Sequence, residues 1–191
     1  MSEVSDMLDS LAMELIDSAR LEKAGMMASG FIASHIASGE GLDPLSPATS
    51  AYRGAGAKPL QDTGSLRDSI TYELTGRDTV SVGTNKPYAE IQNNGGVITA
   101  RKNWLFIPAA GTRKLQRKYG HTPSQVLSGL KSSGFSVFRK GRTVCYRERG
   151  KNKTAHVAYY LKKTVTIPAR RFFHLTDSET EQIIEEIFPE V

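Results

Sequence analysis

The sequence contains one cysteine, one tryptophan and no long hydrophobic run. The single cysteine, Cys145, excludes an internal disulfide framework, and we expect it to be a small core residue. No run of about 18 consecutive apolar residues occurs, so no transmembrane helix and no membrane partner are expected. The first residues lack the basic start and the apolar segment of a secretory signal. We therefore expect a protein that is made, and used or assembled, in a reducing cytoplasm.

The overall composition is that of an ordinary globular protein. With 191 residues, of which 39% are hydrophobic and 24% charged, the chain is neither collagen-like nor fully disordered. A chain of this length buries roughly 70% of its unfolded surface and needs no metal or disulfide for stability. We expect a single domain, residues 1–191, with a basic insertion at about 101–155.

Acidic and basic residues are separated along the chain. The formal net charge is +5, but residues 1–100 carry −6, residues 101–171 carry +17 and residues 172–191 carry −6. Glu148 is the single acid of the middle segment. Such a separation favours either a polyanionic partner or complementary contacts between copies of the chain.

Residue patterns that carry catalysis are scarce. None of the histidines has the spacing of a metal site, and we expect each to be structural or on the surface: His35, His121, His156 and His174. A metal-dependent nuclease would need several carboxylates near the basic segment, which offers only Glu148. The sequence therefore predicts no enzyme, no metal site and no cofactor.

Hydrophobic periodicity predicts a long helix near the start of the chain and a short one near its end. Residues 4–36 carry apolar side chains at helical spacing. Thr176 and Glu179 match a capping box, which starts a last helix with acids in its first turn. Residues 37–60 are rich in Gly, Ser and Pro without apolar periodicity, which predicts a long loop.

The segments between these helices have the patterns of strands. Alternating or short apolar runs predict strands at 66–74, 80–82, 88–91, 104–108 and 157–167. The fold class is therefore α+β: a mostly antiparallel β-sheet packed by a long N-terminal helix and a short C-terminal helix.

The basic segment contains elements of its own. Pairs of bases that repeat every four residues would line one face of a helix: Arg113, Lys114, Arg117 and Lys118. Thr122 and Gln125 predict the capped start of a second helix. Residues 135–139 and 143–147 then predict a β-hairpin.

These bases suit contacts with an anionic surface. Together with three bases of the hairpin turn, Arg139, Lys140 and Arg142, they are candidate contacts to DNA phosphates or to another subunit. No helix-turn-helix, zinc-finger or RNA-recognition motif accompanies them, so a DNA contact would be independent of base sequence. A sequence-independent DNA-binding module is therefore one of the functions that the sequence leaves open.

Three further motifs occur in a fixed order, at residues 60–70, 82–96 and 167–173. In the first, Asp62-Thr-Gly64 predicts a tight turn before a strand that begins at Leu66. In the second, Tyr88 and Ala89 would point to opposite faces of a strand, and Gly95-Gly96 permits a sharp bend. In the third, Pro168 fixes the backbone ahead of Arg170.

The motifs, their order and the flanking helices resemble the tailed-phage virion morphogenesis family, which includes tail-completion and head–tail joining proteins. The residues that carry this resemblance are Asp62, Thr63, Gly64, Leu66, Arg67, Tyr88, Ala89, Gly95, Gly96, Pro168 and Arg170.

The resemblance implies a structural protein that acts in tail completion or at the head–tail neck. It implies a homo-oligomeric ring, commonly a hexamer, that caps the tail and joins it to the connector. The implied partners are other copies of the chain, the tail tube or tail terminator and the head connector, with non-specific contact to passing DNA. The implied location is the tail or neck of the virion, after assembly in the host cytoplasm.

Overall fold

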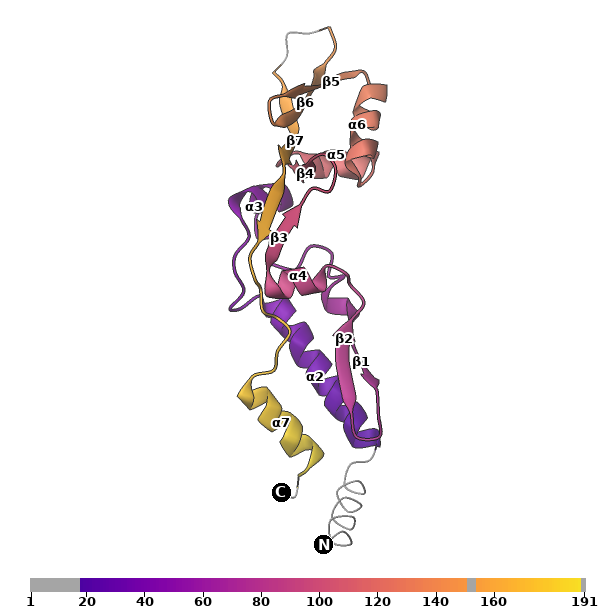
Figure 1. Ribbon diagram of the computed structural model, residues 1–191, viewed down its shortest axis with the longest axis vertical. Coiled ribbons are helices and arrows are strands. Elements are labelled where there is room, and N and C mark those ends of the chain that lie inside the picture. Colours follow the sequence, from indigo (N-terminus) through magenta and orange to yellow (C-terminus); the bar gives the residue numbers. More distant parts are fainter. Residues whose placement is uncertain (1–17, 151–153, 190–191) are drawn as a thin grey trace. The chain divides into compact units, whose positions relative to one another are not determined.

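The computed structural model describes residues 18–150 and 154–189, which divide into two compact units (Figure 1). Unit 1 comprises the described residues of 1–42, 59–94 and 169–191, and unit 2 comprises those of 43–58 and 95–168. Unit 2 is therefore inserted between segments of unit 1. The single domain stays a prediction, while the described residues of the expected insertion at 101–155 all belong to unit 2.

The longest described helix of unit 1 is α2 (Ser18–Ser38), and the earlier part of the predicted helix lies outside the described residues. Its apolar stripe packs against the antiparallel hairpin of β1 (Ile70–Leu74) and β2 (Val80–Thr84). Helix α7 (Asp177–Ile187) lies along another part of α2 (Figure 1). The buried cluster of unit 1 consists of Ile32, Ile36, Leu66, Ala89 and Phe172.

The predicted start of α7 is confirmed in atomic detail. The Thr176 side chain accepts a hydrogen bond from the Glu179 backbone N–H, and the Glu179 side chain accepts one from the Thr176 backbone N–H. This reciprocal pair satisfies two donors that a helix start would otherwise leave open.

In unit 1, one predicted strand begins later than expected and another is wrong. The chain at Leu66 enters a 3₁₀ turn, η1 (Arg67–Ser69), because the Asp68 and Ser69 N–H groups donate to carbonyls three or four residues back, and β1 begins only afterwards. The segment at 88–91 is part of helix α4 (Ala89–Asn94). A run this short does not distinguish helix from strand by periodicity.

The predicted loop at 37–60 is also only partly correct, because it contains helix α3 (Pro47–Arg53) of unit 2. Ser46 caps this helix by accepting from the Thr49 N–H at 3.3 Å, and a proline occupies its first turn. The helix buries no residue, so it has no apolar stripe from which periodicity could have revealed it.

Unit 2 is built on a four-stranded antiparallel sheet of order β4-β7-β6-β5. Its strands are β4 (Leu105–Pro108), β5 (Phe135–Lys140), β6 (Thr143–Glu148) and β7 (His156–Lys162). The core of unit 2 joins this sheet to its helices through Val126, Leu130, Val144, Ala158, Tyr159 and Leu161.

Two helices accompany the sheet of unit 2, α5 (Thr112–Tyr119) and α6 (Pro123–Ser132). The predicted hairpin and the capping box at Thr122 are both confirmed. Cys145 is buried in β6, as expected of a core residue. Within the described residues, no helix is long and apolar enough to cross a membrane. The α+β class is confirmed.

The predicted strand at 157–167 is divided at Lys163 into β7 and β8 (Thr164–Ile167). Strand β8 pairs with β3 (Gly96–Thr99) in a separate two-stranded ribbon. Five residues, 100–104, stand opposite the single residue Lys163 between the β3–β8 and β4–β7 ladders. We call residues 100–104 the bulge, because one strand here has more residues than its partner can pair with.

Packing of α2 on the β1–β2 hairpin depends on a glycine. A Cβ at Gly25 would lie 2.6 Å from side-chain atoms of Tyr72 and Val80. We predict that Gly25→Ala destabilises unit 1 by about 1–3 kcal/mol, because the hairpin must move away from the helix. Gly30→Ala on the same helix meets nothing within 4 Å and should stabilise by about 0.5–1 kcal/mol. Urea unfolding of both variants checks this, and equal stabilities would contradict it.

Candidate functional site

The three sequence motifs converge in unit 1. Leu66 from the first motif, Ala89 from the second and Phe172 from the third are all buried in one cluster on α2. Segments that are far apart in the chain therefore share one core. Within this unit the motifs build the fold.

The first motif forms the predicted turn. Gly64 has a φ of +78°, and a Cβ there would lie 3.1 Å from a carboxylate oxygen of Asp68. Arg67 pairs with the same carboxylate at 2.7 Å. The hydroxyl of Thr63 accepts from the Ser65 N–H at 3.4 Å. These contacts fix the chain just before η1.

The second and third motifs are joined by an asparagine and a glutamine that sequence reasoning did not single out. The Asn93 side-chain oxygen accepts from the N–H groups of Phe172 and Phe173, at 3.1 and 3.0 Å. The Gln92 carbonyl accepts from the Arg170 N–H at 2.9 Å, and its side chain accepts from the Arg170 guanidinium at 3.3 Å. Their only signal in the sequence was their place beside Gly95, which was interpreted as a simple break.

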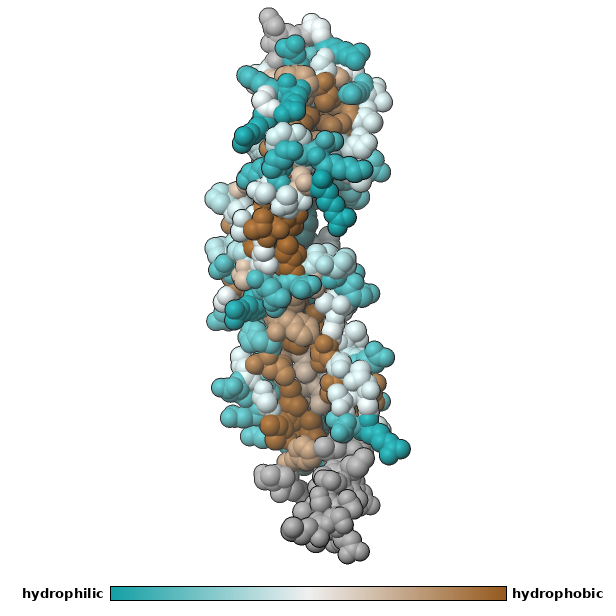
Figure 2. Space-filling view, viewed as in Figure 1, coloured by the Kyte–Doolittle hydropathy of each residue, from teal (hydrophilic) through white to brown (hydrophobic). Residues whose placement is uncertain are grey.

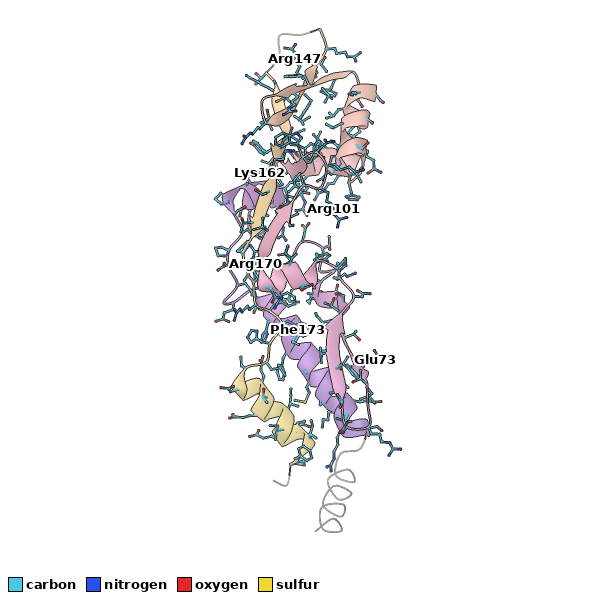
Figure 3. All side chains as sticks on the ribbon, viewed as in Figure 1. Glu73, Arg101, Arg147, Lys162, Arg170 and Phe173 are labelled. Carbon is cyan, nitrogen blue, oxygen red and sulfur yellow. The ribbon has the colours of Figure 1, made fainter. Side chains whose placement is uncertain are left out.

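Arg170 is 7% exposed, so it is a structural residue of unit 1 (Figure 3). Tyr88 and Phe173, at 43% and 38% exposed, are motif residues of unit 1 that offer large aromatic surfaces to solvent. Gly95 and Gly96, at φ of 72° and 152°, connect α4 to β3 with backbone conformations that favour glycine. Pro168 follows the end of β8.

An ion pair joins the two helices of unit 1. The Nε2 atom of His35 on α2 lies 2.8 Å from a carboxylate oxygen of Glu179 on α7, and Nδ1 lies 3.3 Å from the Phe172 carbonyl. The His35 ring also stacks on His174 with centroids 4.6 Å apart.

Opposing effects act on the pKa of Glu179. Partial burial raises it, but the N–H and hydroxyl of Thr176, with the hydrogen bond and charge of His35, outweigh burial and hold the pKa below its ordinary value. The carboxylate is therefore stabilised in its ionised form at the point where α7 meets α2.

Charge is divided between the two units even more sharply than along the sequence. The segments of unit 1 hold 7 Lys/Arg and 18 Asp/Glu, a formal net charge of −11. The segments of unit 2 hold 18 Lys/Arg and only two acids, Asp43 and Glu148, a net charge of +16. Unit 2 therefore attracts polyanions and acidic surfaces strongly.

The predicted basic helix exists as α5, but its bases do not form one solvent-facing row. Arg113 is half-buried, with its guanidinium 5.8 Å from the ring of Tyr52 and 3.3 Å from the Arg53 carbonyl. Three bases of α5 are exposed: Lys114, Arg117 and Lys118. The helix therefore uses one predicted contact residue for packing on α3 and leaves three for a partner.

The bases of the β5–β6 hairpin surround its turn. Gly141, with a φ of +56°, occupies the first turn position, as type II′ hairpin turns require. Arg139, Lys140 and Arg142 are all exposed beside it. Arg147 on β6 and Arg101 in the bulge are exposed as well, and the Arg147 guanidinium lies 5.4 Å from the centroid of the Phe138 ring on β5.

The bulge and the hairpin turn together form a basic groove around the single tryptophan, the Trp104 groove. It has a volume of about 480 Å³. Its lining residues come from the bulge, the turn and the end of β7: Trp104, Arg142, Thr143, Tyr160, Leu161, Lys162, Lys163 and Thr164. Lys162 and Lys163 were not among the predicted contact residues, because their pattern indicated only a strand. In the described part of the chain, no group of three His, Cys, Asp or Glu residues is placed to hold a metal ion.

Comparison with known proteins gives one match. The model of the phage virion morphogenesis family matches residues 1–191, the whole chain. No curated protein matches the chain, and no solved structure matches it.

The pKa of Glu179 makes the α2–α7 contact sensitive to acid. A lowered carboxyl pKa stabilises the fold fully above the ordinary value of about 4.3, and this stability is lost as the pH falls through the lowered value. We predict that wild type is more stable than Glu179→Gln at neutral pH and that the difference closes in acid.

Urea unfolding at a series of pH values measures this difference. Glu181→Gln removes an exposed carboxylate from the same helix and serves as the control for net charge. If wild type and Glu179→Gln differ in unfolding free energy by the same amount in acid and at neutral pH, the contact between His35 and the Glu179 carboxylate does not stabilise unit 1.

Proposed function

Because this chain belongs to the phage virion morphogenesis family, we propose that it is a structural protein of tail completion or of the head–tail neck. In this proposal, copies assemble in the host cytoplasm into a ring, a hexamer, that caps the tail and joins it to the head connector. The protein acts by binding its neighbours, and no catalytic step is involved. Its final location is the tail or neck of the virion.

The observation that supports assembly is the exposed apolar surface of the β3–β8 ribbon. Val97 and Ile98 of β3 are 62% and 39% exposed. They pair across the ladder with Thr166 and Val165, so β-branched side chains cover the ribbon. Figure 2 shows hydrophobic residues gathered over this part of unit 2. Solvent-exposed apolar groups of this kind mark surfaces that bind other proteins.

The edges of the ribbon are also unprotected. Among the described residues, neither β3 nor β8 has a second neighbouring strand. Neither strand contains a charged residue or a proline, the features by which natural edge strands avoid pairing with other chains. A two-stranded ribbon is marginally stable alone in water. Contact with another chain would stabilise it.

The charge division favours another copy of the chain as the neighbour. A closed ring is built from heterologous contacts, in which one patch of each subunit meets a different patch of the next. Unit 1 at −11 and unit 2 at +16 provide two patches of opposite charge on every copy. The charges steer the encounter, while the apolar ribbon supplies the buried contact area.

We predict that the purified protein forms a discrete oligomer and that Val97→Lys dissociates it. A lysine at this exposed position leaves the monomer folded but places a charge where the interface must be apolar. Analytical ultracentrifugation gives the mass of each form. Met26→Lys changes an equally exposed apolar residue in unit 1 and controls for the added charge. An unchanged mass for Val97→Lys would contradict assembly through the ribbon.

The role in the virion has its own test in infected cells. Phage that carry Val97→Lys should accumulate filled heads and separate tails, counted by negative-stain microscopy, whereas phage with Met26→Lys should give joined particles. If phage that lack the protein still make tails of normal length and join them to heads, the proposed function is refuted.

A further inference from the structure

Two basic side chains contact Trp104 before any partner arrives: Lys163, which lines the Trp104 groove, and Arg139, which lies beside it. Lys163 Nζ donates to the Asn103 carbonyl at 2.7 Å and lies 4.4 Å from the centroid of the Trp104 ring. Arg139 Nε donates to the Gly141 carbonyl at 2.8 Å, and its guanidinium carbon lies 5.3 Å from the same ring. Cation–π contacts at these distances attract. The two cations are thereby fixed around one aromatic side chain.

Two further cations line the groove next to them. Arg142 is positioned by the hairpin turn, and its carbonyl accepts from the Leu161 N–H of β7 at 2.8 Å. Lys162 extends from the end of β7 (Figure 3). Within the described residues, no carboxylate pairs with any of the four cations, Arg139, Arg142, Lys162 and Lys163. These four cations repel one another, and a bound anion would reduce this repulsion.

We infer that the Trp104 groove binds the phosphate backbone of duplex DNA without reading its sequence. The cations attract phosphate groups, and the hydroxyl of Thr164 can donate a hydrogen bond to a phosphate oxygen. Because side chains of the groove are already held in place, less entropy is lost on binding. The β5–β6 turn and the bulge offer no helix for the major groove, so the contact is with the backbone. Bases of α5 extend the same charge over the rest of unit 2.

Duplex DNA fits the groove better than the two obvious alternatives. Sites for single strands expose an aromatic face on which a base stacks, whereas the Trp104 ring is already contacted by Arg139 and Lys163. Protein–protein interfaces are depleted of charge at their centres. The groove is rich in unpaired cations, as DNA interfaces are, whereas the β3–β8 ribbon has the apolar character of a protein interface.

Trp104 makes the inference directly measurable, because it is the only tryptophan of the chain. Its fluorescence should change when a short duplex of random sequence is added to the full-length protein. The logarithm of the binding constant should fall linearly with the logarithm of the salt concentration. Lys162→Gln and Arg142→Gln should each reduce the magnitude of this salt slope by about one unit. Lys162→Arg keeps the charge and should have the slope of wild type.

Lys131→Gln is the matched control, since it removes one exposed cation of unit 2 from α6, outside the groove. It should leave the tryptophan response and most of the slope unchanged. Equal effects of Lys131→Gln and Lys162→Gln would overturn the inference, as would tighter binding of single strands. A fluorescence change that follows protein concentration but not DNA would also overturn it, because an acidic surface of another copy would then fill the groove.

These experiments test the DNA-binding proposal and the ring proposal separately, so that one can fail while the other holds. Lys162→Gln should retain the oligomeric mass of wild type, whereas Val97→Lys should lose that mass and keep the response of Trp104 to DNA. Unfolding in urea confirms that each variant is folded, and all four substituted positions, 97, 131, 142 and 162, are exposed.

Discussion

Burial of Phe172 against helix α2 is the contact on which unit 1 depends. Phe172 is 1% exposed and lies among Ile32, Ile36, Leu66 and Ala89, which come from three other parts of the chain. The Asn93 side chain holds the backbone on both sides of this contact by accepting from two consecutive N–H groups. A polar clamp around a buried aromatic ring fixes the chain just before it enters α7. The family motifs are therefore explained by folding, and we propose other surfaces for partner binding.

Two such surfaces lie on unit 2, and their chemistry differs. The β3–β8 ribbon is uncharged, β-branched and exposed, while the Trp104 groove is lined by cations that no described carboxylate neutralises. An apolar surface gains free energy by excluding water from another protein, whereas a cationic groove gains it by releasing counterions from a polyanion. The bulge opposite Lys163 separates the two surfaces along a single pair of strands. We therefore propose that one chain can hold a neighbour and contact DNA without competition between the two.

Local signals in the sequence predicted the parts of the fold that local interactions determine. The capping boxes at Thr122 and Thr176, the hairpin at 135–147 and the stripe of α2 are all present. Helices α3 and α4 were missed because each is shorter than the window over which periodicity is informative. The groove could not be predicted, because it depends on a register difference between two ladders whose paired strands are far apart in sequence. The separation of acidic and basic residues was visible in the sequence. That each charge belongs to a separate structural unit was not, because each unit is built from segments that are not continuous in the chain.

The insertion of unit 2 into unit 1 sets an order for folding during synthesis. The sheet and helices of unit 2 are complete once residue 168 has been made, and its β5–β6 and β6–β7 pairs join strands that are close in sequence. Unit 1 lacks Phe172 and α7 until the last part of the chain has left the ribosome. Local contacts form faster than distant ones, and completed segments fold as they emerge. The basic unit can thus fold first, and the complete subunit with its α2–α7 contact exists only after the chain has been released.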